Sequence, residues 1–225
     1  EAYNDLDLEN LDSALNIAKE LEGYEKNDTG ISEIRDKVDL KNLFGQIYSS
    51  QKKFREAIDS FLLALDILNN SFEKDFELET TVLNNLALAY DDAGEFELAE
   101  KYIELATKRQ ESSIQDDFFL ITSYNNSAAL TFDEENVLKY SKKAYDLFNQ
   151  SKTISKNSDT FVNTINFLGG YYLRKGHFEK NSELKATHYT KAKNYYDEAI
   201  KYVEEKMVNN IFPYYQFLYN YSDLI

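Results

Sequence analysis

Four asparagines recur along the chain at nearly constant spacing. They are Asn42, Asn84, Asn125 and Asn166, and the intervals between them are 42, 41 and 41 residues. An asparagine side chain carries two N–H donors and a carbonyl acceptor, so it can pair with a peptide main chain whatever side chains that peptide bears. A row of asparagines therefore has the chemistry needed to hold an extended peptide. The alternative is that these side chains join the successive elements that carry them.

The sequence has few residue patterns that indicate catalysis or metal binding. His177 and His188 stand 11 residues apart, and the chain has no cysteine, so the residues of a common zinc site are missing. Gly169-Gly170 lies inside a helical pattern and does not follow a strand, as a phosphate-binding loop would. With 40 carboxylates in the chain, proximity in sequence carries no weight for acid–base chemistry. We expect no enzymatic activity, no metal and no cofactor.

The charge balance restricts the partners. Asp and Glu outnumber Lys and Arg by 40 to 25, which gives a formal net charge of −15 at pH 7. Affinity for nucleic acids and for anionic membrane surfaces depends on Lys and Arg, so we expect neither partner. The chain has no uncharged apolar run long enough to span a bilayer, so we expect no membrane insertion. No signal-peptide pattern opens it. The cytoplasm is the favoured compartment, and an extracytoplasmic sensor region is the alternative.

A repeating phrase surrounds each asparagine and predicts the elements that position it. Each copy has a small residue three positions after the asparagine, and most copies continue with an aromatic residue and an Ala-x3-bulky-x2-Ala stretch. Each phrase predicts a pair of antiparallel helices that needs neighbours to cover its apolar face, which is the pattern of a stacked helical array. The small residues are Gly45, Ala87, Ala128, Gly169 and, after an apparent 11-residue insertion, Ser222.

The phrase resembles the tetratricopeptide repeat, whose W-x2-L-G-x2-Y and A-x3-F pattern is matched here except for the Trp. The resemblance is specific at 38–68, 80–110 and 162–203, weaker at 120–150 and partial at both ends. The period near 42 residues is similar to that of bacterial peptide-pheromone receptors, kinesin light chains and repeat regions of bacterial sensor kinases, of which the first and last are most similar in composition. The resemblance implies an all-α, right-handed superhelical solenoid of about ten helices, with the first helix of each pair lining a concave groove.

We expect residues 1–225 to form one array within a longer protein. The spacing between Ala128 and Val137 is three residues short, so the turn there is tight or the register differs. Residues 177–188 are interpreted as an insertion that adds a helix extension and a longer loop. The aromatic helix predicted at 211–225 would leave an apolar face for end-to-end self-association. The predicted divisions are a partial repeat at 1–30, repeats at about 31–72, 73–113, 114–152 and 153–208, and a partial repeat at 209–225.

The resemblance also implies which residues line the groove. In tetratricopeptide repeats the position of the four asparagines faces the concave side. Other candidates lie one, four or five residues after the small residue of each copy. Acidic and polar groups at the middle, and an apolar end, suit a ligand with a basic or neutral face; alternatively, Asp91 and Asp92 only end a helix. These further candidates include Gln46, Leu88, Asp91, Asp92, Phe132, Leu173 and Arg174.

The resemblance implies two alternative functions. The first is a peptide- or protein-binding repeat region of a bacterial regulatory or signalling protein, with the ligand held in the groove. The second is a static scaffold or adaptor that assembles other proteins without a groove ligand. Ligand contact by the asparagines would support the first, and a groove closed by the chain itself would support the second.

Overall fold

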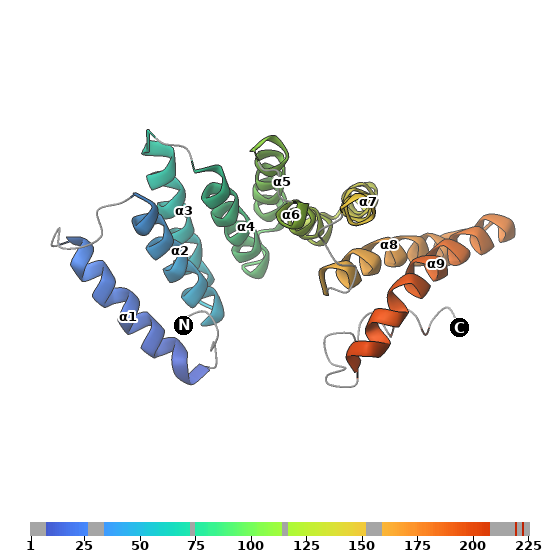
Figure 1. The fold of residues 1–225 in the computed structure, drawn as a ribbon, viewed down its shortest axis with the longest axis horizontal. Coiled ribbons are helices and arrows are strands. Elements are labelled where there is room, and N and C mark those ends of the chain that lie inside the picture. The colour runs from blue at the N-terminus through green and yellow to red at the C-terminus, as the bar shows by residue number, and fades with distance from the viewer. Residues whose placement is uncertain are drawn as a thin grey trace. The chain divides into compact units, whose positions relative to one another are not determined.

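The computed structural model describes residues 8–26, 34–72, 75–113, 117–151 and 159–207, together with the single positions 219 and 222. It divides into two compact units, residues 1–114 and 115–225, and each unit is described by itself. The single array stays a prediction. Every regular element of the described residues is an α-helix (Figure 1), and the helices are α1 (Leu8–Lys26), α2 (Ile34–Ser50), α3 (Phe54–Asn70), α4 (Phe76–Asp92), α5 (Phe96–Ser113), α6 (Asp117–Leu130), α7 (Glu134–Gln150), α8 (Asp159–Phe178) and α9 (Ser182–Met207).

In the first unit, helices that follow one another in sequence also pack against one another. Helix α1 packs on α2, α2 on α3, α3 on α4 and α4 on α5. The first helices of the two pairs, α2 and α4, also touch each other. The short connections make α2 and α3, and likewise α4 and α5, antiparallel pairs, as the repeating phrase predicts.

Close helix crossings explain the small residues of the phrase. A Cβ atom at Gly45 would lie 2.4 Å from Cε1 of Phe61, which is 1% exposed on α3. Gly169 has the same relation to Tyr196 of α9, whose Cζ would lie 2.5 Å away. A larger residue at either glycine would push the ring or the helix out of place, at a cost of roughly 1–3 kcal/mol.

The turn inside each of the first two pairs contains one residue in the left-handed backbone region. Lys52 has φ of 59° between α2 and α3, and Gly94 has φ of 78° between α4 and α5. Each stands seven residues after the small residue of its first helix. Glycine adopts this region without steric strain, whereas a lysine does not. The two turns therefore share one geometry, and only the second has the residue type that favours it.

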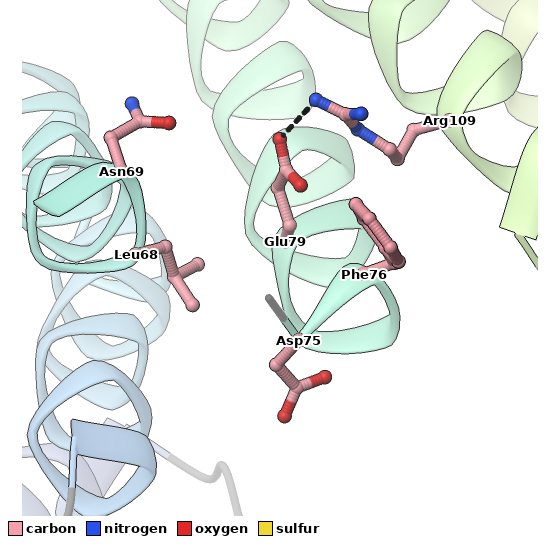
Figure 2. A pocket seen from close by; sticks show the side chains of 6 residues that line it. All are labelled: Leu68, Asn69, Asp75, Phe76, Glu79 and Arg109. Atoms are coloured by element: carbon pink, nitrogen blue, oxygen red, sulfur yellow. Dashed lines mark hydrogen bonds and ion pairs between the residues drawn. The ribbon is translucent and has the colours of Figure 1, made fainter. Parts of the chain in front are cut away.

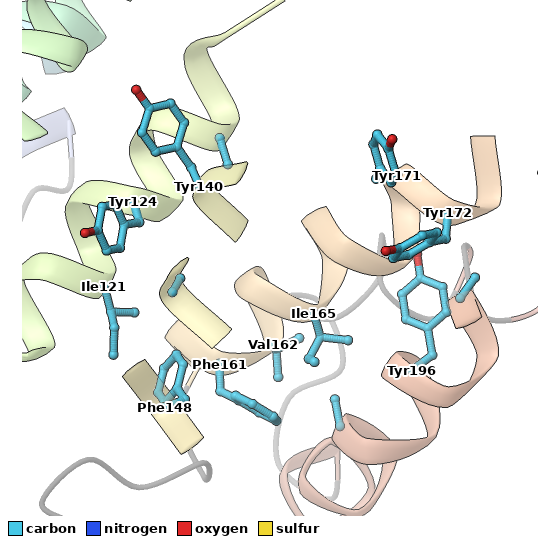
Figure 3. Close-up of a cluster of buried hydrophobic side chains, with 14 of the residues drawn as sticks. Ile121, Tyr124, Tyr140, Phe148, Phe161, Val162, Ile165, Tyr171, Tyr172 and Tyr196 are labelled. Carbon is cyan, nitrogen blue, oxygen red and sulfur yellow. The ribbon is translucent and has the colours of Figure 1, made fainter. Parts of the chain in front are cut away.

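The second unit is built around one aromatic-rich core (Figure 3). Helix α6 packs on α7, α7 on α8 and α8 on α9, and the first helices α6 and α8 touch. The Phe148 and Phe161 rings meet edge to face with centroids 5.1 Å apart. The Tyr145 hydroxyl on α7 donates to the carboxylate of Glu198 on α9, and burial, with this bond, raises the pKa of Tyr145 to about 12.

Helix α6 is shorter than the other first helices. It ends at Leu130, two residues after Ala128, whereas α2 and α4 end five residues after their small residues. The connection to α7 is residues 131–133, and the Asp133 side chain caps α7 by accepting the Glu135 N–H at 2.9 Å. The three missing residues are therefore the last turn of α6. The connection at 131–133 is as long as those at 51–53 and 93–95, so the shortening falls in the helix and the tight turn predicted from the spacing is not found.

The insertion at 177–188 lengthens two helices. Helix α8 continues to Phe178, α9 begins at Ser182, and only residues 179–181 connect them. The Asn181 side chain caps α9 by accepting the Glu183 and Leu184 N–H groups at 2.9 and 3.1 Å. The predicted helix extension is confirmed. The predicted longer loop is wrong, because the inserted residues are taken up by helix.

The ends of the chain are described unequally. Helix α1 lies within the partial repeat predicted at 1–30, with Leu11 and Ala18 buried. The helix predicted at 211–225, and the end-to-end contacts predicted from it, lie outside the described residues except for Tyr219 and Ser222, which are helical. Nine helices are described, against the ten or so predicted.

Candidate protein-binding surface

The exposed side of α4 is the most complete of the predicted groove faces. Leu88 is 42% exposed and Thr81 is exposed, while Asn84 and Asp91 are half-buried. Their spacing of three or four residues places them on one side of the helix. The Asn84 side chain donates to the backbone carbonyl of Thr80, one turn earlier, at 2.9 Å. The result is a stripe of polar groups with one leucine in its middle.

Asn42 on α2 is buried and joins two first helices. It is 4% exposed, and its Oδ1 accepts a hydrogen bond from Nδ2 of Asn85 on α4 at 2.9 Å. Gln46, one turn later, is half-buried, and its backbone carbonyl accepts the Ser50 hydroxyl at 3.0 Å. Asn42 therefore joins two successive first helices, which is the alternative role that the sequence analysis gave for the asparagines.

Asn125 on α6 makes a similar bridge in the second unit. It is 6% exposed, its Oδ1 accepts from the Thr164 hydroxyl at 3.0 Å, and its Nδ2 donates to the Thr160 carbonyl at 3.1 Å. Both partners lie on α8. Asn125 thus fixes α6 against α8 through its donor and its acceptor together.

Asn166 on α8 differs from Asn42 and Asn125. It is half-buried, and its Oδ1 is shielded from solvent and accepts no hydrogen bond from the described residues. A buried carbonyl without a donor is uncommon, because the lost hydration is not replaced. Among the predicted groove residues, this oxygen is the acceptor that a ligand N–H group would satisfy.

Three other predicted groove residues, Phe132, Leu173 and Arg174, do not share one exposed surface. Phe132 is 70% exposed in the connection after α6. Leu173 is 6% exposed and belongs to the core of the second unit, so its side chain supplies little surface to a ligand. Arg174 is exposed and pairs with Glu134 of α7 at 3.5 Å. The apolar end predicted from Phe132 and Leu173 is therefore reduced to Phe132.

Asp91 and Asp92 are the last two residues of α4. Ala93 follows as the C-cap, and the Gly94 N–H donates to the Asp91 carbonyl at 2.9 Å. Burial raises the pKa of the Asp91 carboxyl, and the neighbouring Asp92 carboxylate raises it further. Both residues stand at the end of the helix, and their contact with a ligand stays a prediction.

A pocket of about 270 Å³ lies at the ends of three helices in the first unit (Figure 2). Leu68 is buried at its floor, and Phe76, at the start of α4, is 38% exposed. The Arg109 guanidinium of α5 lies 5.2 Å from the centroid of the Phe76 ring and donates to Glu79 at 2.9 Å. The lining residues are Leu68, Asn69, Asp75, Phe76, Glu79 and Arg109.

The sequence did not reveal this pocket. Asp75 caps α4 by accepting the Leu78 N–H at 3.0 Å, and it also pairs with Arg35 of α2 at 2.6 Å. The pocket therefore depends on where α3 ends, where α4 begins and where the last turns of α5 pass. No periodic pattern carries that information, and only the capping residue before Phe76 is a sequence signal.

The described residues contain no group of three or more His, Asp or Glu side chains arranged to hold a metal ion. Among the described helices, none is both long enough and apolar enough to cross a membrane.

Comparisons with known proteins agree with the helix-pair architecture. Residues 38–112 match the tetratricopeptide repeat family model. The crystal structure of BtubC (BKLC) from P. vanneervenii is similar, with a TM-score of 0.63 and 16% sequence identity over 96% of this chain and 89% of that chain. No curated protein matches the chain. At this identity the structural likeness establishes the fold alone.

The fold class predicted from the sequence, an all-α tetratricopeptide-like solenoid, is confirmed. The tetratricopeptide resemblance is confirmed over residues 38–112. Repeats of this class typically serve as non-catalytic scaffolds for protein–protein interaction, and neither comparison indicates an enzyme family.

Proposed function

We propose that this chain is a protein-interaction module that holds an extended segment of a protein partner along the exposed faces of its first helices. The stripe on α4 carries the proposal, because it combines half-buried hydrogen-bonding groups with an exposed leucine. An extended polypeptide needs both kinds of contact, main-chain hydrogen bonds for affinity and apolar positions for selectivity.

The four asparagines divide into two roles in this proposal. Asn42 and Asn125 hold neighbouring first helices in register through the bonds described above. Asn84 and Asn166 contact the ligand, and the buried Oδ1 of Asn166 accepts one of its N–H groups. The further contacts that we propose with the ligand are Gln46, Leu88, Asp91, Asp92, Phe132 and Arg174.

The charge of the chain defines the chemistry of the ligand. Residues 1–114 contain 26 acidic and 12 basic side chains, a formal net charge of −14. Residues 115–225 contain 14 acidic and 13 basic side chains, a net charge of −1. A field of this sign attracts cations and repels anions. We therefore propose a basic or neutral ligand that contacts the first unit most strongly.

The long repeat and the composition support a role in a bacterial regulatory or signalling protein. A static scaffold is the second candidate, and the bridges made by Asn42 and Asn125 favour it, because these two asparagines are satisfied inside the chain. The two functions differ in a single observable, which is whether a short peptide binds to the first-helix faces.

The test uses peptides selected from an unbiased displayed library against the whole chain, then synthesised and titrated. Leu88 on α4 and Leu105 on α5 are both 42% exposed, so they form a matched pair on a first and a second helix. Leu88→Ser should weaken binding about 10-fold, because an apolar contact is lost, while Leu105→Ser should change it less than about twofold. Asn84→Ala should weaken it roughly 3- to 30-fold.

Equal losses of peptide affinity in Leu88→Ser and Leu105→Ser would contradict binding at the faces of the first helices. If no library peptide binds, the scaffold function is the better account. Melting curves of each variant show whether a loss of affinity comes from a lost contact with the peptide or from a less stable fold.

A further inference from the structure

We propose that Gly170 positions the Arg174 side chain on α8, so that Arg174 and Asn166 together bind the main chain of one extended residue of the protein partner. The three residues are spaced by four, which places them in a row on one side of the helix. A partner segment that passes over α8 is part of the proposed function, on which this assignment rests.

Gly170 differs from the other two glycines of α8 in what surrounds it. A Cβ atom at Gly169 or Gly176 would lie 2.5 or 2.6 Å from a tyrosine ring atom of α9, so the packing there excludes a larger residue. At Gly170 the nearest atom is Nη1 of Arg174 at 3.4 Å, and the next is the Tyr196 hydroxyl oxygen at 3.9 Å. Glycine inside a helix is less favourable than alanine, and the packing of α9 does not require it at Gly170.

The absent side chain of Gly170 leaves the place that the Arg174 guanidinium occupies. Helical side chains point back toward the N-terminus, over the residue four positions earlier. With no side chain at Gly170, the guanidinium lies close to the helix there. Gly170 is buried, although the equivalent residues Leu88 of α4 and Ala129 of α6 are exposed. A side chain as long as leucine at this position would take the place of the guanidinium.

The Arg174 guanidinium has donors left for a ligand. Its contact with Glu134 is made through Nε at 3.5 Å, and Lys175 binds the other oxygen of Glu134 at 3.1 Å. A guanidinium carries five N–H donors, of which the two Nη groups hold four. The contact with Glu134 therefore fixes the side chain at one end and leaves its Nη groups to bind a carbonyl oxygen.

Asn166 supplies the acceptor, one helical turn before Gly170. Its Oδ1 is shielded and accepts no hydrogen bond from the described residues, but the residue as a whole is half-buried. A turn of the amide toward the surface breaks no hydrogen bond of this oxygen. A ligand N–H group would then satisfy an acceptor that is costly to leave without a donor.

The two side chains match the main chain of an extended segment. In a strand, the N–H and the C=O of one residue point to the same side and can both bond to one neighbour. One ligand residue can therefore donate to Asn166 and accept from Arg174, across a helical turn of about 5.4 Å. A helical partner segment could not use this pair, because its N–H and C=O groups bond to one another.

The experiment titrates library-selected peptides against the full chain and its variants. Gly170→Leu places an alkyl chain where the guanidinium lies and should weaken binding about 10-fold, because the bond from Arg174 is lost. Gly23→Leu in α1 is the matched control, because a Cβ atom at Gly23 meets nothing within 4 Å, and it should change affinity less than about twofold. Arg174→Met removes the guanidinium without filling the place at Gly170, and it should weaken binding as much as Gly170→Leu does.

The double variant separates positioning from obstruction. Gly170→Leu combined with Arg174→Met should bind no more weakly than either single variant, because both changes remove the same contact. A further loss in the double variant would show that the leucine itself obstructs the ligand, and it would overturn the positioning role. If melting curves show that Gly170→Leu does not fold, Arg174→Met and the altered peptides below decide the test.

Peptides with one amide replaced by an ester test the acceptor, because an ester has no N–H group. At one position of a selected peptide, the ester should weaken binding to the unaltered chain roughly 3- to 10-fold. The same ester should leave binding to Asn166→Ala unchanged, since that variant already lacks the acceptor. Esters that weaken binding to both chains equally would overturn the role of Asn166.

Failure of the α8 site can be told apart from failure of the proposed function. Peptides that depend on Leu88 but on neither Asn166 nor Arg174 would overturn the α8 site and leave the binding face of α4 standing. If no library peptide binds, the proposed function fails, and the α8 site fails with it.

Discussion

At the scale of residues, the asparagines show how one side-chain type serves two purposes in a repeated position. Asn42 and Asn125 occupy equivalent places in α2 and α6, and both are buried and bonded to the following first helix. Asn166 occupies the same place in α8 with a buried oxygen that lacks a donor. Spacing alone could not separate these cases, because the partners of Asn42 and Asn125 stand 43 and 39 residues away in the sequence.

Asn42→Ala should lower the free energy of unfolding by about 1–3 kcal/mol. The substitution removes the acceptor of Asn85, whose side-chain N–H is then left partly buried without its partner. Urea denaturation measures the change. Asn70→Ala is the control, because Asn70 is exposed and donates to Asp66 within its own helix. A double variant with Asn85→Ala should lose less than the sum of the two singles, and strict additivity would contradict the bridge.

At the scale of elements, the helices followed from the repeating phrase because its small residues have a steric reason. Gly45 and Gly169 leave room for Phe61 and Tyr196, and that requirement is local enough to appear in the sequence. The length of α6 and the core position of Leu173 depend on how neighbouring helices end and pack. The sequence spacing therefore indicated that residues are missing near the end of α6, but it did not indicate that Leu173 is buried.

Lys52→Gly should raise stability by about 0.5–1 kcal/mol, and Gly94→Ala should lower it by about 1 kcal/mol or more. Both residues have positive φ at equivalent turns, so the left-handed backbone penalises lysine and alanine but not glycine. Thermal unfolding of the two variants checks the pair. Gly23→Ala in α1 is the control. In contrast to Gly94→Ala, it should raise stability, because Gly23 lies within a helix and has open space around it. A loss of stability in Lys52→Gly would contradict the shared turn geometry.

At the scale of the whole molecule, the net charge belongs almost entirely to one unit. Residues 1–114 carry −14 and residues 115–225 carry −1, and this division follows from the sequence once the boundary between the units is known. Like charges repel, and added salt screens them over a distance that shrinks from about 30 Å at 0.01 M to about 3 Å at 1 M. The first unit should therefore be the salt-sensitive one.

Raising NaCl from about 10 to about 500 mM should slow native-state hydrogen exchange in α4 and α5 and leave α8 and α9 nearly unchanged. In an array of neighbouring contacts, each unit responds largely to its own charges. Residue-resolved exchange at constant pH measures both units in one sample, so the second unit is the internal control. Equal slowing in the two units would show that the charge division has no effect on stability.

The central claim is that the first helices bind a partner segment, and methyl NMR of the two matched leucines tests it without altering the chain. When a selected peptide is added, the Leu88 methyl signals on α4 should shift and saturate with the affinity measured by titration. The Leu105 methyl signals on α5, from a leucine of equal exposure, should stay in place. Shifts at Leu105 with none at Leu88 would assign binding to the second helices and contradict the account.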